Sequence, residues 1–191
     1  MRRCLPVFMA ELRNIDSISA RCLRFAILCA ARTGEAIGAP WEEIDLEQKL
    51  WSLPAERMKG ERPHRVPLSG PALDILREMA VIRNGSSYVF PGQRPGQPLS
   101  PMAHFMLLRR LGRTDLTVHG FRSSFADWCA ERTNFPSELR EMALAHAVGN
   151  KVEAAYRRGD LFAKRRQLAE AWARFCTIPV VGVTEATPIR A

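Results

Sequence analysis

Apolar residues recur at the spacing of an amphipathic helix along most of the chain. In the first long example, either Ser17 or Ser19 can cap a helix. The apolar face of this helix is formed by Cys22, Phe25, Ala26, Cys29 and Ala30. The same spacing predicts further helices over residues 6–15, 71–82, 100–111, 120–133, 136–146, 150–157 and 161–176.

The middle of the chain has a different pattern. KLWSLP (49–54) and HRVPLS (64–69) predict two short strands, and the polar AERMKGERP between them predicts a hairpin loop. Pro54 and Pro67 favour strands at a sheet edge. A third strand is expected at SYVF, residues 87–90. We therefore predict a mainly α fold with a small antiparallel β-sheet, the α+β class.

Composition sets limits on the class of protein. The length of 191 residues suits one domain, expected over residues 1–176, followed by a flexible tail over 177–191. The longest apolar run, residues 25–31, is too short to span a membrane, and no signal peptide is recognised. Five scattered cysteines without a CxxC pair indicate reduced thiols in a cytoplasmic protein, without a disulfide framework or a metal site. We expect no cofactor.

Net charge narrows the choice of partner. The chain has 28 Lys and Arg against 20 Asp and Glu, which gives a net charge of +8. A basic excess of this size favours an anionic partner, most often nucleic acid. Charge alone also fits a merely basic soluble protein, so specific residues have to decide.

Five short stretches carry groups that can handle a phosphate. The first two are Arg32 in AARTGE and Lys59 at the predicted hairpin tip. Glu35 shares a helix face with Arg32 and can orient its guanidinium, although a plain surface ion pair is the alternative. A loop lysine can supply a proton or a point charge, although most loop lysines are only solvated.

The third stretch is VHGFRSSFADW. His119 and Arg122 project from one side of a helix start, where backbone N–H groups favour an anion. Phe121 and Phe125 face the core. The alternative is a capping histidine beside an exposed arginine, but the clean separation of polar from aromatic residues favours a functional site.

The last two stretches are LAHAVGN, with His146, and EAAYRRGDLF, with Tyr156. A lone histidine at a helix end is more often a C-cap than a catalyst. Tyr156 is one of two tyrosines and is followed at once by Arg157 and Arg158. It is either a surface tyrosine near solvated arginines or a nucleophile beside a phosphate.

In this order, Arg, hairpin Lys, His-x-x-Arg, His and Tyr make the sequence resemble the catalytic domain of the tyrosine recombinases, the phage-integrase family, in its prophage and genomic-island branch. The matching text is AARTGEAIGAPWEEIDLE, AERMKGERPHRVPLS, VHGFRSSFADWCAERT, LAHAVGNKVEAAYRRGDLF and KRRQLAEAWARF, within about residues 15–176. Full-length relatives carry N-terminal arm-binding and core-binding domains, both of which we expect to be absent from this chain.

The resemblance implies a mechanism. Tyr156 would attack a scissile phosphodiester to give a 3′-phosphotyrosyl enzyme and a free 5′-hydroxyl. Arg32 and Arg122 would hold the two non-bridging oxygens. Lys59 would protonate the leaving 5′-oxygen and contact the DNA.

The remaining candidates would assist these groups. His146 would donate a hydrogen bond to the phosphate, and His119 would accept the tyrosine proton or bind the phosphate. Glu35 would orient Arg32 and take no part in the chemistry. Arg157 and Arg158 would contact DNA backbone or a neighbouring subunit.

The implied function is site-specific DNA recombination that integrates or excises a prophage or genomic island, a mobile element. The implied partners are double-stranded attachment-site DNA, further integrase protomers in a DNA-bound tetramer, and accessory DNA-bending proteins, without a membrane. Two other functions stay open. One is a DNA-binding remnant without catalysis, and the other is a nicking-closing activity like that of type IB topoisomerases.

Overall fold

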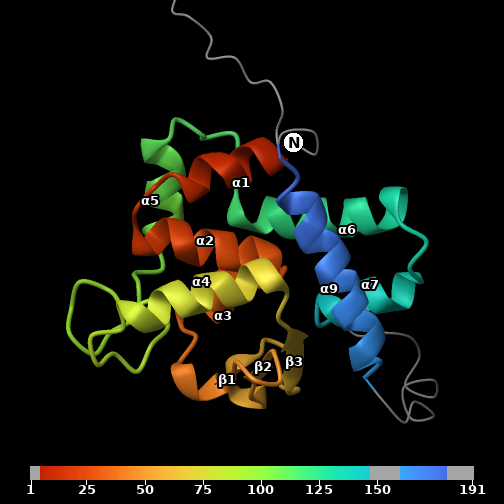
Figure 1. Ribbon diagram of the computed structural model, residues 1–191, viewed down its shortest axis with the longest axis horizontal. Coiled ribbons are helices and arrows are strands. Elements are labelled where there is room, and N and C mark those ends of the chain that lie inside the picture. Colours follow the sequence, from red (N-terminus) through yellow and green to blue (C-terminus); the bar gives the residue numbers. More distant parts are fainter. Residues whose placement is uncertain (1–4, 147–159, 180–191) are drawn as a thin grey trace, which may run out of the picture.

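The computed structural model describes residues 5–146 and 160–179, and most of them lie in helices (Figure 1). The described helices of the first part are α1 (Leu5–Arg13), α2 (Ile18–Leu28), α3 (Thr33–Ile37), α4 (Gly70–Val81) and α5 (Ala103–Arg110). They are followed by α6 (Val118–Arg132), α7 (Ser137–Ala143) and α9 (Phe162–Cys176). Two 3-10 turns, η2 (Trp41–Glu43) and η3 (Ala55–Arg57), flank the strands. The predicted helix over 150–157 lies outside the described residues.

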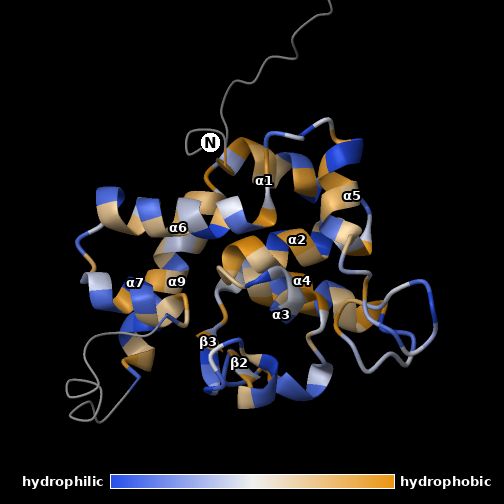
Figure 2. Ribbon diagram, turned by 180° about the vertical axis from the view of Figure 1, so that it is seen from behind, coloured by the Kyte–Doolittle hydropathy of each residue, from blue (hydrophilic) through white to orange (hydrophobic). Residues whose placement is uncertain are grey.

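Helix α2 lies in the middle of the fold and packs against α1, α3, α4, α5, α6 and α9 (Figure 1). Ser17 caps it, because its Oγ accepts a hydrogen bond from the backbone N–H of Ala20 at 3.2 Å. Hydrophobic colour runs along α2 in Figure 2, whereas the long loop before α5 is largely hydrophilic. No helix in the described part of the chain is both long and apolar enough to cross a membrane.

The sheet has three antiparallel strands in the order β1 (Ile44–Asp45), β2 (Leu50–Leu53), β3 (His64–Pro67). Its central strand pairs Trp51 with Ile44 on one side and with Val66 on the other. The predicted fold class, mainly α with a small antiparallel sheet, is therefore confirmed.

The third strand was predicted at the wrong place. Residues 87–90 make only an isolated bridge, between Tyr88 and Pro40. Their backbone bonds to the turn before η2, where the N–H of Val89 donates to the carbonyl of Ala39 at 2.8 Å. Val89 is buried there. The apolar residues at 87–90 therefore reflect packing against a turn and not a strand.

Helices α6 and α9 are joined by a cluster of rings from Phe125, Trp128, Trp172 and Phe175, whose neighbouring centroids lie 5.1–6.4 Å apart. The indole Nε1–H of Trp172 donates to the carbonyl of Ile27 at 2.8 Å, which ties α9 to α2. The apolar face predicted for α9 therefore packs within the chain, and it fixes the last described helix against the centre of the fold.

Candidate active site

Arg32 and Glu35 form a half-buried pair at the start of α3. The Glu35 carboxylate accepts one hydrogen bond from the backbone N–H of Arg32 at 2.8 Å and another from its Nη1 at 2.6 Å. The Glu35 side chain is only 8% exposed, whereas that of Arg32 is 30% exposed. The carboxylate therefore holds a guanidinium that still reaches solvent, and the alternative of a plain surface ion pair is wrong.

Arg122 is buried in the second turn of α6. One guanidinium nitrogen donates to the carbonyl of Ala30, two residues beyond the end of α2. The other donates to the carbonyl of Leu144, just after α7, at 2.8 Å. Burial and, to a smaller extent, the nearby charge of Arg32 lower the pKa of Arg122 to about 10, while Glu35 opposes the shift. Arg122 thus stays charged at neutral pH, and the reading of an exposed arginine is wrong.

The two carbonyls that Arg122 contacts lie close in the sequence to two of the predicted site residues. Ala30 precedes Arg32 by two residues, and Leu144 precedes His146 by two. One buried cation therefore holds the backbone on which both of those side chains stand. Because the pKa of Arg122 responds to the charge of Arg32, the two guanidinium groups are also electrostatic neighbours.

The two candidate histidines are exposed. His146 lies three residues beyond α7, and its Nδ1 is 2.8 Å from a carboxylate oxygen of Glu141. His119 lies in the first turn of α6, one turn before Arg122. The cap of α6 is Thr117, whose Oγ1 accepts from the N–H of Gly120 at 3.0 Å, so His119 is not the capping residue.

Lys59 is exposed in the loop between β2 and β3, in agreement with the predicted hairpin position. Tyr156, Arg157 and Arg158 lie outside the described residues. Asp160 is the next described residue, and its carboxylate accepts a hydrogen bond from Nη2 of Arg165, in the first turn of α9, at 2.6 Å.

Anion binding is the chemistry that this arrangement favours. Arg32 and Arg122 place two permanent positive charges at the junction of α2, α3 and α6, and one of them is largely removed from water. Planar guanidinium groups are suited to the oxygens of a phosphate. Preorganised donors in such a partly dry site stabilise added negative charge far more than solvated ones do.

Most of this chain is similar to known proteins. The family model of the phage integrase family matches residues 5–160. The chain belongs to the phage integrase family. It is 39% identical over 173 residues to the prophage integrase IntA of Escherichia coli K12, covering 88% of this chain and 42% of that protein.

Other integrases match a similar stretch. The prophage integrase IntZ of Escherichia coli K12 is 34% identical over 88% of this chain and 42% of its own length. The integrase of Shigella phage Sf6 is 30% identical over 83% of this chain and 41% of its own length. The chain therefore spans less than half the length of these curated relatives.

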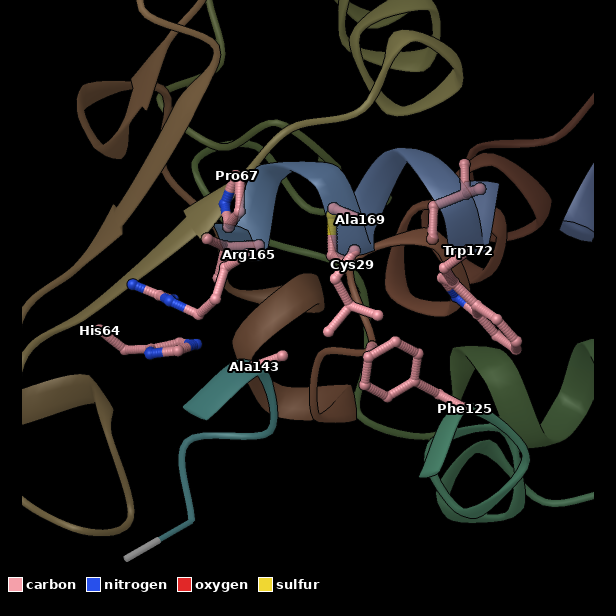
Figure 3. A pocket seen from close by; sticks show the side chains of 12 residues that line it. Cys29, His64, Pro67, Phe125, Ala143, Arg165, Ala169 and Trp172 are labelled. Atoms are coloured by element: carbon pink, nitrogen blue, oxygen red, sulfur yellow. The ribbon is translucent and has the colours of Figure 1, made fainter. Parts of the chain in front are cut away.

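In this integrase-family chain, three residues near the site were missed at the level of sequence. Arg57 bonds to Glu43 and to the carbonyl of Glu35. His64 and Arg165 lie side by side on the wall of a small pocket between β3, α9 and the end of α2 (Figure 3). Burial lowers the pKa of His64 to about 4, and the charge of Arg165 acts in the same direction. A polar residue within a predicted strand or a short loop gives no sequence signal of such burial.

Proposed function

We propose that this chain is the catalytic domain of a site-specific DNA recombinase. It would cleave and rejoin DNA through a 3′-phosphotyrosyl intermediate, to integrate or excise a prophage or genomic island. The observation that carries this proposal is buried Arg122, which holds the backbone beside Arg32 and beside His146. Membership of the phage integrase family supports the same reaction.

The nucleophile would be Tyr156. A phenol has a pKa of about 10, so only about 0.1% is ionised at neutral pH. The phosphodiester that it attacks is an anion and repels a phenolate. Arg32 and Arg122 would offset both difficulties by holding the non-bridging oxygens, and Glu35 would keep Arg32 in place.

Proton transfer would involve three further residues. Lys59 would give a proton to the 5′-oxygen as its bond to phosphorus breaks, while the bond from the tyrosine oxygen to phosphorus forms. His119 would accept the tyrosine proton or bind the phosphate, and His146 would donate a hydrogen bond to a phosphate oxygen. The carboxylate of Glu141 beside His146 Nδ1 favours the tautomer that carries a proton on that nitrogen.

Duplex DNA would be the partner. The net charge of +8 supports binding to the phosphate backbone, with a strong dependence on salt. Arg157, Arg158 and Lys59 would contribute to it. Synapsis of two attachment sites would take four protomers, together with accessory proteins that bend the DNA, in the cytoplasm.

Covalent capture tests the proposal. The 191-residue chain is incubated with nicked suicide duplexes tiled across the DNA that flanks its own gene, and adducts are resolved in denaturing gels. Tyr156→Phe should abolish the adduct because the phenolic oxygen is gone. Tyr88→Phe is the matched control, since Tyr88 is the other tyrosine and only half-buried, and it should leave the adduct unchanged.

The same assay separates the competing functions. An adduct that persists in Tyr156→Phe would show that another residue is the nucleophile. Salt-sensitive binding without any adduct would indicate a catalytically idle remnant. Adducts together with relaxation of supercoiled plasmid, but without joining of two sites, would indicate a nicking-closing enzyme.

A further inference from the structure

Arg57 lies at the end of η3, in the loop that carries Lys59, and its guanidinium bonds to two other elements. One nitrogen donates to the carboxylate of Glu43, on η2. Another donates to the backbone carbonyl of Glu35, on α3, at 2.8 Å. Two of its nitrogens thus donate within the chain, so Arg57 links η3 to η2 and to α3.

The carboxylate at the centre of this link is buried. The Glu43 side chain is 6% exposed, and the same oxygen that meets Arg57 also accepts from the indole Nε1–H of Trp51 at 2.9 Å. Trp51 is fully buried in the central strand. A buried carboxylate with two donors fixes both of them, because leaving either bond unmade exposes an unpaired charge to an apolar surrounding.

Gly38 gives the guanidinium its space beside α3. A Cβ added at Gly38 would lie 3.3 Å from an Arg57 nitrogen and 3.2 Å from the carbonyl oxygen of Gly34. Both distances are tighter than ordinary contact, so a side chain at this position would press the guanidinium away from the carbonyl of Glu35. The close approach of η3 to α3 is therefore built into the local sequence.

Lys59 follows Arg57 by two residues, and the residue between them is also fixed. Met58 is 5% exposed, and its backbone N–H donates to the carbonyl of Ala55 at 3.0 Å. The two residues before the exposed Lys59 are therefore both held in place, Arg57 by its bonds to η2 and α3 and Met58 by its burial. Arg57 bonds to the backbone carbonyl of Glu35, and the side-chain carboxylate of the same Glu35 holds Arg32.

We propose that Arg57 is a positioning residue that fixes the proton donor Lys59 relative to the phosphate-holding Arg32. This inference rests on the proposed function, in which Lys59 protonates the leaving 5′-oxygen. Arg57 itself touches neither the DNA nor the reacting atoms. Losing it should misplace the lysine and slow the step that needs a proton, while leaving binding of the phosphate in place.

A substrate that needs no proton donor isolates this step. In a nicked suicide duplex with sulfur in place of the bridging 5′-oxygen, the bond that breaks is P–S, and a thiolate leaves. A thiol has a pKa of about 8.5, whereas a hydroxyl is about as weak an acid as water, so its pKa is far higher. The sulfur therefore departs without the lysine proton, and a defect confined to proton donation disappears.

Single-turnover cleavage is measured on both substrates for the wild type, Arg57→Met and Lys59→Met. On the oxygen substrate, Lys59→Met should be about 100-fold slower or more, and Arg57→Met about 10- to 100-fold slower. On the sulfur substrate, both should return to within about 3-fold of wild type. Arg77→Met is the matched control, because Arg77 is exposed on α4 and pairs with Asp74 on its own helix; it should change neither rate.

The outcomes separate the two levels of the proposal. The inference is overturned if Arg57→Met slows cleavage equally on both substrates, or on neither, while sulfur still rescues Lys59→Met. The proposed function would stand in that case. Failure of sulfur to rescue Lys59→Met overturns the role of the lysine and the inference with it. If Arg57→Met does not fold, Glu43→Gln/Arg57→Met removes the unpaired buried charge, and the same comparison applies.

Discussion

Replacing Arg165 by methionine is expected to lower the free energy of unfolding by about 3 kcal/mol. The Arg165 side chain is 3% exposed at the start of α9. Its Nε and Nη2 donate to the backbone carbonyl and the carboxylate of Asp160, at 2.7 and 2.6 Å. Its Nη1 donates to the carbonyl of Arg65 on β3 at 2.6 Å. Methionine fills similar space but donates none of these bonds.

The magnitude follows from two opposing contributions. Hydrogen bonds that involve a charged group contribute about 1.5–3 kcal/mol each, so the three together contribute about 4.5–9 kcal/mol. Burial of the guanidinium opposes them by several kcal/mol, and that burial also lowers the pKa of Arg165 while Asp160 raises it. The carboxylate left behind is 41% exposed, so water replaces part of what it loses.

Urea unfolding followed by circular dichroism measures the loss. Arg166→Met is the matched control, because Arg166 follows on the same helix and its one backbone hydrogen bond, to the carbonyl of Gln48, is exposed. That control should change stability by no more than about 0.5 kcal/mol. A loss below about 1 kcal/mol for Arg165→Met, or equal losses in both variants, would refute the argument that the buried network is what stabilises this junction.

Three further changes test other parts of the structure. His104→Leu removes a buried ring whose two nitrogens have no partner in the described structure, and should stabilise by about 1–2 kcal/mol at pH 7 in urea titrations. Burial lowers the pKa of His104 to about 4, so as the pH falls the unfolded chain binds a proton at this residue before the folded chain does. The stability of the wild type should therefore fall by up to about 3 kcal/mol between pH 6.5 and 4, and the variant should lack this pH-dependent loss. Gly92→Ala would place a Cβ 2.4 Å from the carbonyl oxygen of Pro98 and should cost about 2 kcal/mol in urea unfolding, whereas Gly60→Ala meets nothing and should be neutral. Glu35→Gln should slow single-turnover cleavage about 10-fold with little change in melting temperature, because the amide keeps the shape but loses the charge that holds the Arg32 guanidinium.

The helices could be predicted from sequence because a buried face repeats every three to four residues. The bounds of α2 and α6 agree with the pattern to within a few residues. Strand β1 could not be predicted, since two residues, Ile44 and Asp45, are too short to show alternation. The apolar run at 87–90 was wrongly predicted to be a strand. An apolar pattern indicates that a segment is buried, but it does not indicate whether the backbone of that segment pairs with a strand or with a turn.

The candidate residues could be named from the sequence, whereas their burial could not be predicted. Arg122 was expected beside a phosphate, but its two acceptors are carbonyls 92 and 22 residues away in the sequence. Arg57 was not singled out, because its meaning depends on Glu43 being buried in another element. Local patterns report which face of an element is apolar, and they carry no information on which distant carbonyl a polar group will meet.

Buried arginines bracket the stretch that contains the proposed nucleophile. Arg122 holds the carbonyl of Leu144 on its N-terminal side, and Arg165 holds Asp160 on its C-terminal side. Tyr156 precedes Asp160 by four residues, a span that reaches at most about 14 Å when fully extended. Both anchors bond to backbone carbonyls, so they fix the backbone on either side of this stretch, at residues 144 and 160. In the proposed reaction, the anchors would limit the reach of the tyrosine, and the charges of Arg32 and Arg122 would favour the position from which it attacks the phosphate.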